Sequence, residues 1–189
     1  YNLGADTGTM FLAINLNNRK NDKGKYYVSS IKQQWFSDIN FRTAIDYARD
    51  RNSLVTNIAQ GLAVPLFTSE SLNGIYLNKN IQGHKRDLKL AKQYRATSGF
   101  CKPSDGFLYD RKGHKVEFDL YTNAGNTERE SIGVMLKQDL SDLGMTVNFK
   151  PVEFNTLVNK LTNSYDWDMA IMGLTGSPLE PHNGKNVWA

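Results

Sequence analysis

The fold is decided by residues 116–150, which read VEFDLYTNAGNTERESIGVMLKQDLSDLGMTVNFK. Val116, Phe118 and Leu120 alternate with polar residues, as expected of a strand with one buried face. Thr127, followed three residues later by Glu130, forms a capping-box pattern that predicts the start of a helix. Apolar residues then recur at helical spacing, and Gly144 follows them as a C-terminal signal: Ile132, Met135, Leu136, Leu140 and Leu143.

The pattern continues through two further elements and a third strand. Val147 and Phe149 alternate with polar residues and predict a second strand. Asn155 is the expected N-cap of a helix that carries Leu157, and residues 169–172, MAIM, form a short apolar strand. The order β-α-β-α-β predicts neighbouring parallel strands with right-handed crossovers, so we expect an α/β fold whose parallel core is flanked by helices.

The first half of the chain predicts less regular structure. Residues 10–16 favour a strand, and a polar loop is expected to reach about residue 34. A cap at Ser37 or Asp38 precedes apolar stretches at 41–48 and 54–58, separated by polar residues, so two short helices fit better than one. Gly61 is expected to end the second.

Residues 64–83 predict a long surface loop, because they lack a sustained hydrophobic period. A helix over about 87–97 precedes Gly99, and a hairpin is expected to turn near residues 112–113. We therefore divide the chain into residues 1–100, a strand with helices and a long loop, and residues 107–189, the β-α-β-α-β unit.

The direction of the parallel strands predicts where a ligand would bind. In open parallel sheets, ligands lie beyond the carboxyl ends of the strands, where helix N-termini offer free N–H groups. The turns at 123–126 and 174–177 should therefore face each other across a crevice. The stronger candidates for ligand contact follow the last strand, and the weaker ones follow the first: Gly173, Leu174, Thr175, Gly176 and Ser177, then Asn123 and Asn126.

Composition excludes several classes of protein. The chain has 189 residues, 40% of them hydrophobic, and no apolar run approaches a membrane span. Its single Cys101 excludes a disulfide framework and a multi-cysteine metal site, and is either a small buried apolar residue or an incidental thiol. His84, His114 and His182 lie far apart in polar contexts, so we expect surface roles and no metal.

No pattern in the sequence predicts catalysis. Phosphate-binding, dinucleotide-binding, nucleophile-elbow and HExxH motifs are missing, and carboxylates such as Asp38, Asp50, Asp166 and Asp168 sit where caps and turns need them. We therefore expect no cofactor and no catalytic acid/base pair. A hydrolase or transferase using the same crevice stays open as an alternative. The net charge of +4 permits a third alternative, a basic module that binds anionic polymers. The clusters of basic residues lack interleaved aromatic residues, however, and do not predict nucleic-acid binding.

Three segments together resemble a known family. FSDINFRTAIDYARDRNSLVTNIAQGLAVP, YTNAGNTERESIGVMLKQDLSDLGMTVNFKPVEFNTLVNKL and DWDMAIMGLTGSPLEPHNGKNVW, in this order, are similar to the C-terminal lobe of extracellular solute-binding proteins of family 5. These are the peptide, oligopeptide and nickel receptors of ABC importers. The resemblance implies a mixed-sheet lobe of the type II periplasmic-binding-protein kind, which closes on its solute against an N-terminal lobe.

The resemblance also implies partners and a location. The expected partners are a peptide-like solute, the ABC permease subunits and the N-terminal lobe of the same parent chain, of which residues 1–189 would be a single-lobe fragment outside the cell or in the periplasm. Peptide-binding relatives typically carry Gly-Trp-x-x-Asp after the last strand. Here Gly173 matches, Leu174 replaces the Trp and Ser177 replaces the Asp that holds a peptide ammonium. Specificity for a free amine is therefore not expected.

Overall fold

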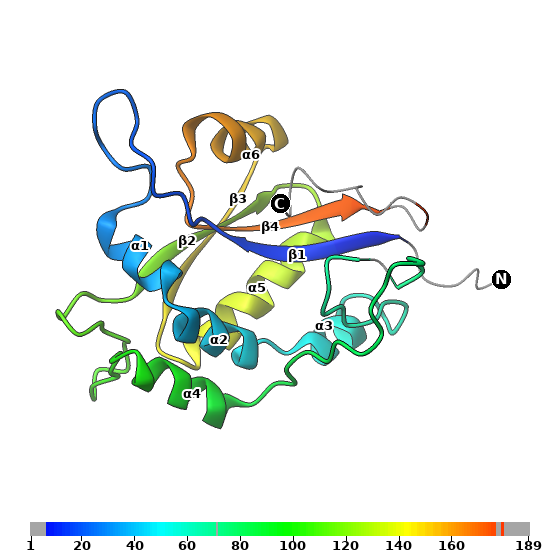
Figure 1. Ribbon diagram of the computed structural model, residues 1–189, viewed down its shortest axis with the longest axis horizontal. Helices are drawn as coiled ribbons and strands as arrows, with labels where there is room; N and C mark the ends of the chain where they lie inside the picture. Colours follow the sequence, from blue (N-terminus) through cyan, green and yellow to red (C-terminus); the bar gives the residue numbers. More distant parts are fainter. Residues whose placement is uncertain (1–6, 71, 177–178, 180–189) are drawn as a thin grey trace.

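The computed structural model describes residues 7–70, 72–176 and 179 (Figure 1). Its strands are β1 (Gly8–Ile14), β2 (Glu117–Asn123), β3 (Thr146–Val152) and β4 (Met169–Thr175). Its helices are α1 (Ser30–Ser37), α2 (Ile39–Ala48), α3 (Arg51–Asn57), α4 (Leu88–Thr97), α5 (Thr127–Ser141) and α6 (Phe154–Asn159), the last continued by the π-helical turn η1 (Lys160–Ser164).

The four strands form one mixed sheet in the order β1-β4-β2-β3. β2 pairs in parallel with both β3 and β4, as the β-α-β-α-β pattern predicts. β1 pairs antiparallel with β4, with Gly8 opposite Thr175 and Ile14 opposite Met169. The start of β1 therefore lies beside the end of β4, and the expected α/β fold with a parallel core is confirmed.

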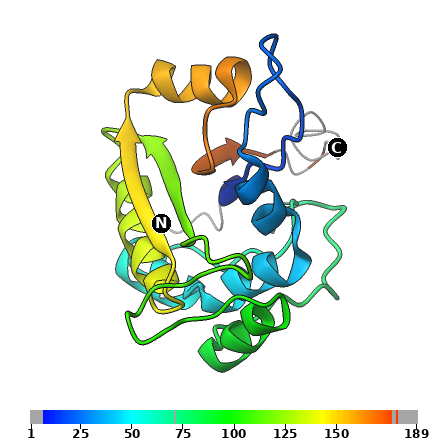
Figure 2. The same ribbon diagram turned by 90° about the vertical axis from the view of Figure 1, so that its left-hand side faces the viewer.

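Helices cover both faces of this sheet (Figures 1 and 2). Alternation along β2 directs Phe118 and Leu120 into the main core, where α5 contributes Leu136 and Leu140. On the other face, Tyr121 packs in a smaller cluster with Leu157 of α6. Because both faces are covered, β2 is buried at successive positions toward its end, and only its first half keeps the two-residue period seen in the sequence.

The predicted helices are present, but some caps lie one or two residues away. Asp38 caps α2 and Asp50 caps α3, so the expectation of two short helices is confirmed. α5 begins one residue earlier than its capping-box pattern suggested, because Asn126 rather than Thr127 is the N-cap and accepts the bond from the Arg129 amide. Likewise the side chain of Glu153, not Asn155, caps α6.

Three expectations for irregular segments are corrected. The loop predicted to reach residue 34 instead ends at α1, which Ser29 caps and which buries Trp35 and Phe36. α3 ends at Asn57, so Gly61 lies in a turn beyond the helix. The expected hairpin is reduced to isolated bridges that join Tyr109 to residues 101 and 115. Over 64–83, outside unassigned residue 71, turns and bends replace regular structure, as predicted.

Candidate functional site

The carboxyl ends of β2 and β4 lie at one edge of the sheet. The two strands are parallel neighbours, with Leu120 opposite Met169 and Tyr121 opposite Ala170. Asn123 ends β2 and Thr175 ends β4, so the described parts of the two predicted turns lie at the same edge of the sheet. The cavity at this edge is lined by residues 173–175 and by none of residues 123–126, so it is not the crevice that we expected between the two turns. The first turn of α5 follows β2 directly and brings its side chains to the same place.

A cavity of about 500 Å³ opens at this edge. One wall is the start of β1 and the end of β4, the second is α3 with the segment after it, and the third is the first half of α5. The sheet contributes residues 8–12, 171 and 173–175, and α5 contributes Glu128, Arg129, Ile132 and Leu136. The remaining lining residues are Arg49, Arg51, Leu54, Val55, Ile58, Ala59, residues 62–66 and Leu72. Figure 1 shows these elements together around the end of β4.

The predicted site residues divide into three groups. Gly173, Leu174 and Thr175 line the cavity. The amide of Gly176 donates to the Thr7 carbonyl at 3.0 Å, which ties the end of β4 to the chain entering β1, and Gly176 does not line the cavity. Ser177 lies outside the residues that the structure describes.

Asn123 and Asn126 do not line the cavity but hold a residue that does. The Asn123 Oδ1 accepts a hydrogen bond of 2.7 Å from Arg129 Nη1, and the Asn126 Oδ1 accepts one of 2.9 Å from the Arg129 amide. Glu130 accepts a further bond from the amide of Gly125 at 2.8 Å, which fixes the turn. The first turn therefore positions Arg129 at the cavity wall.

Position 173 has room only for a glycine, because the side chain of Arg129 lies against it. A Cβ atom at Gly173 would come 2.6 Å from Arg129 Nη2, closer than such atoms approach in proteins. The space that a side chain at position 173 would take is therefore filled by the Arg129 guanidinium. Sequence reasoning missed Arg129 because Arg at the third position of a helix is common on exposed surfaces.

A second basic cluster borders the cavity at the junction of α2 and α3. Arg49 pairs with Asp46, Arg51 pairs with the same carboxylate at 2.7 Å, and His84 Nδ1 lies 2.7 Å from its other oxygen. Burial alone would raise the pKa of Asp46, but Arg49, His84 and Arg51 outweigh it and hold that pKa at about 2. Burial and then Arg51 lower the pKa of Arg49, against the opposing effect of Asp46.

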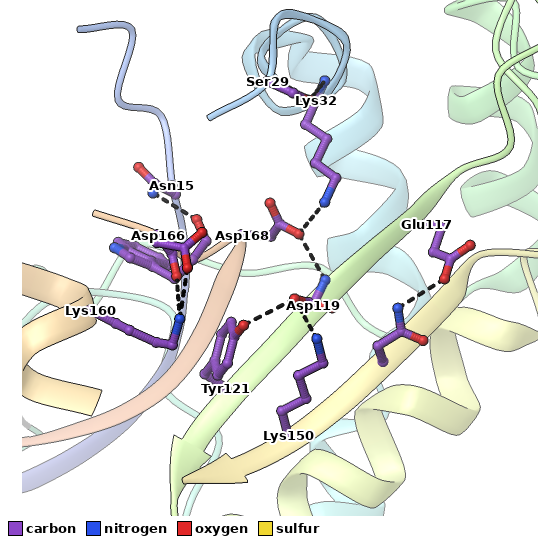
Figure 3. Close-up of polar contacts among 12 residues, drawn as sticks. Asn15, Ser29, Lys32, Glu117, Asp119, Tyr121, Lys150, Lys160, Asp166 and Asp168 are labelled. Atoms are coloured by element: carbon purple, nitrogen blue, oxygen red, sulfur yellow. Dashed lines mark hydrogen bonds and ion pairs between the residues drawn. The ribbon is translucent and has the colours of Figure 1, made fainter. Parts of the chain in front are cut away.

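Another polar cluster lies at the amino end of β4, away from the cavity (Figure 3). Asp168 accepts 2.5 Å and 2.8 Å bonds from Lys32 Nζ and the Asp119 amide, and Lys150 Nζ lies 2.7 Å from the Asp119 carboxylate. Asp168 lies in the bend before β4, as expected, but it is only 8% exposed and its contact with Lys32 joins α1 to the sheet. Every charge in this cluster has a partner, which indicates a structural role.

Other candidate groups do not form a site. His84 is exposed and His114 is partly buried, each pairs with an aspartate, and His182 lies outside the described residues. Cys101 is exposed, so the alternative of a buried apolar residue is wrong. Over the described ranges, no three His, Cys, Asp or Glu side chains are grouped to hold a metal ion. None of the helices built from these residues has the length and apolarity to cross a bilayer.

Comparison with known proteins identifies the family. Residues 2–189 match the group described as "Bacterial extracellular solute-binding proteins, family 5 Middle". The chain is 32% identical over 145 residues to the oligopeptide-binding protein AppA of Bacillus subtilis, covering 75% of this chain and 27% of that protein. It is 30% identical over 167 residues to a Deinococcus radiodurans protein named "Probable ABC transporter-binding protein", covering 84% of this chain and 28% of that one.

Solved structures agree with this assignment. The structure of Bacillus subtilis AppA in complex with a nonapeptide superposes with a TM-score of 0.79 at 27% identity, covering 94% of this chain and 33% of AppA. The Campylobacter jejuni NikZ structure with Ni(L-His) shares the fold, with a TM-score of 0.76 at 22% identity, over 94% of this chain and 31% of NikZ. The chain thus spans about a third or less of these relatives, whose family is one of binding proteins and not of enzymes. It belongs to the bacterial extracellular solute-binding proteins of family 5.

Proposed function

We propose that this chain is one lobe of the solute-binding component of an ABC importer and that it contributes the cavity at the end of β4 to the binding cleft. The observation that carries the proposal is the position of the cavity in a chain whose full length matches the family. It opens at the carboxyl ends of parallel strands, where open α/β sheets bind ligands.

The proposed solute is a peptide or a peptide-like molecule. AppA, a relative by sequence and by fold, is named an oligopeptide-binding protein and has been solved with a nonapeptide. At the end of β4, residues 173–175 line the cavity beside a wall of apolar residues from α3 and α5. Such a wall suits the side chains of an extended peptide, whose backbone can pair with a strand end.

The proposed partners follow from the same reading. A second lobe of the parent chain would cover the cavity, since most of the binding area of a two-lobed receptor forms when the lobes close. The closed form would then deliver its solute to the permease subunits at the outer face of the membrane or in the periplasm. No covalent chemistry is needed at any step.

The hydrolase or transferase alternative gains no support. Among the described residues, the cavity wall offers one carboxylate, Glu128, the two hydroxyl residues Thr9 and Thr175, and no histidine, cysteine or serine. A general base and a nucleophile within reach of each other are the minimum for such chemistry. The alternative of a basic module is also unsupported. The charges of Arg51 and Arg86 are neutralised by ion pairs with neighbouring aspartates.

Calorimetric titration of the intact protein with a mixture of short peptides tests the proposal. The change Leu174→Asp should weaken binding by about tenfold or more, because it puts a desolvated carboxylate on the apolar wall. The control Val134→Asp alters a residue of α5 that is 59% exposed and should leave binding unchanged. Equal affinities in the wild type and in both variants would mean that the cavity is not part of the binding site.

A further inference from the structure

The cavity wall has a specific imbalance of charge. Three guanidinium groups, those of Arg49, Arg51 and Arg129, line it together with one carboxylate, Glu128. Arg49 and Arg51 share the carboxylate of Asp46, which lies behind the wall, and are largely accounted for by that contact. Arg129 is the guanidinium without such a partner.

The contacts of Arg129 leave its charge uncompensated. Nη1 donates to the neutral amide oxygen of Asn123, and Nε is buried without a hydrogen-bond partner. None of the ion pairs within the described residues includes Arg129. A partly buried guanidinium normally finds a carboxylate or phosphate, because losing hydration without a counter-charge is costly. The site is therefore short of one anion.

The side chain is also held in place rather than free to swing into solvent. Asn123 fixes one nitrogen, and the backbone of Gly173 lies directly beneath Nη2. The backbone amide of Arg129 also donates a hydrogen bond to the side chain of Asn126. A cation held in one position binds an anionic group with less loss of side-chain entropy than a flexible surface cation does.

The groups beside Arg129 are apolar. Ile132 and Leu136 line the cavity on the same helix, and Leu54, Val55 and Ile58 line it from α3. A ligand group that fits this wall combines a carboxylate with an aliphatic or aromatic portion, the first for the guanidinium and the second for the apolar side chains. The free end of a peptide and an acidic side chain next to apolar residues both have this chemistry.

We infer that this cavity binds a carboxylate of the solute and that Arg129, positioned by Asn123 and Gly173, is the residue that selects for it. The inference rests on the proposed function and narrows it to anionic peptides or peptide-like acids. It assigns Asn123 and Gly173 positioning roles, since neither needs to touch the solute.

Three synthetic probes distinguish the source of the carboxylate. All are N-acetylated pentapeptides based on Ala-Leu-Ala-Leu-Ala: one with a free C-terminal carboxylate, one with a C-terminal amide, and one amide with glutamate in the fourth position. Calorimetry on the intact protein should give an affinity at least about tenfold higher for one of the two acids than for the neutral amide, because a charge-assisted bidentate contact is gained. The acid that binds better identifies the source.

Three variants assign the effect to Arg129. Arg129→Gln should abolish the preference for the acid, so that the acid and the neutral amide bind with similar affinity. Gly173→Ala should reduce the preference too, because the added Cβ displaces the guanidinium, and it keeps every charge. Lys137→Gln removes one positive charge from the exposed side of the same helix and should leave the preference intact. Thermal melting of each variant checks that it is folded.

The outcomes separate this inference from the proposed function. If all three probes bind equally, peptide binding stands and selection for a carboxylate is wrong. If an acid is preferred but both Arg129→Gln and Gly173→Ala retain the preference, the assignment to Arg129 is wrong. If none of the probes, nor the mixture of short peptides, binds the intact protein, the proposed function fails and takes this inference with it.

Discussion

At the scale of single residues, Asp46 is the group on which the basic side of the cavity depends. It is the shared counter-ion of Arg49 and Arg51 and also contacts His84. Removing it would leave two neighbouring, partly buried guanidinium groups without that partner. We therefore expect Asp46→Asn to lower the free energy of unfolding by about 3 kcal/mol near neutral pH, as for other broken buried pairs.

The effect of Asp46 should depend on pH in a defined direction. Its pKa is lowered in the folded protein from the ordinary 3.8 to about 2, so folding favours the ionised form. The stabilisation is then complete above the unfolded pKa and is lost as the pH falls through the folded one. Urea unfolding of wild type and Asp46→Asn should differ most above about pH 5 and converge toward pH 2. A difference that stays constant over this range would contradict the assigned role, and the exposed Asp22→Asn is the control.

Individual residues also show what the sequence could not predict about the site. The position of Gly173 and Leu174 after an apolar strand made them candidates, and they do line the cavity. Arg129 carried no comparable signal, because its position depends on Asn123 at the end of β2 and on Gly173 in β4, which is distant in sequence. Contacts of this kind are set by the pairing of β2 with β4 and have no local pattern.

At the scale of elements, α5 holds the sheet to the helical layer. Leu140 is 1% exposed in the main core, whereas Val134 on the same helix is 59% exposed. We expect Leu140→Ala to cost about 2 to 5 kcal/mol of unfolding free energy and Val134→Ala less than about 0.5. Chemical denaturation measures both. Similar losses in the two variants would mean that α5 does not pack as described.

Elements with a regular period were predictable, and those defined by few residues were not. The alternation at Phe118 and Leu120 and the stripe ending at Leu143 span enough residues to identify β2 and α5. α1 was missed because its buried Trp35 and Phe36 are adjacent and give no helical spacing within its eight residues. The caps moved because Asn126 and Glu153 compete with nearby polar residues for the same free amides.

At the scale of the whole molecule, Arg86 joins the long loop to two helices. Its guanidinium lies 3.3 Å from Asp50 at the start of α3 and 3.3 and 3.1 Å from Asp139 and Asp142 in and just after α5. Asp139 also accepts a 3.0 Å bond from the Asp50 amide. Burial raises the pKa of Asp139 and, with the charges of Asp50 and Asp142, outweighs the opposing hydrogen bond and Arg86.

This network predicts a measurable effect on the wall formed by α3. Arg86→Gln should lower the free energy of unfolding by about 1 to 2 kcal/mol, since three carboxylates then face one another without a cation. Hydrogen exchange should increase at α3, which borders the cavity, and remain unchanged at β3. Lys85→Gln removes the same charge from an exposed neighbour and should have little effect. Unchanged exchange at α3 would mean that Arg86 does not hold that wall.

The arrangement of the molecule follows from the sequence only as far as the parallel core. The parallel direction of β2, β3 and β4 was implied by the crossover lengths, but their order, with β2 between β4 and β3, was not. The antiparallel addition of β1 beside β4 was not implied either, because β1 is more than 150 residues away in the chain. That pairing brings the start of β1 to the cavity and completes its wall. The edge that should bind a ligand was therefore predictable, and the shape of the cavity was not.

The most direct test is a crystal structure of the intact protein purified from its own host with its solute retained. The account predicts that the solute contacts Leu174 and Thr175 at the end of β4 and places an acidic group beside Arg129. A solute bound instead on the outer face of the sheet around Lys150, with no contact to the end of β4, would contradict it.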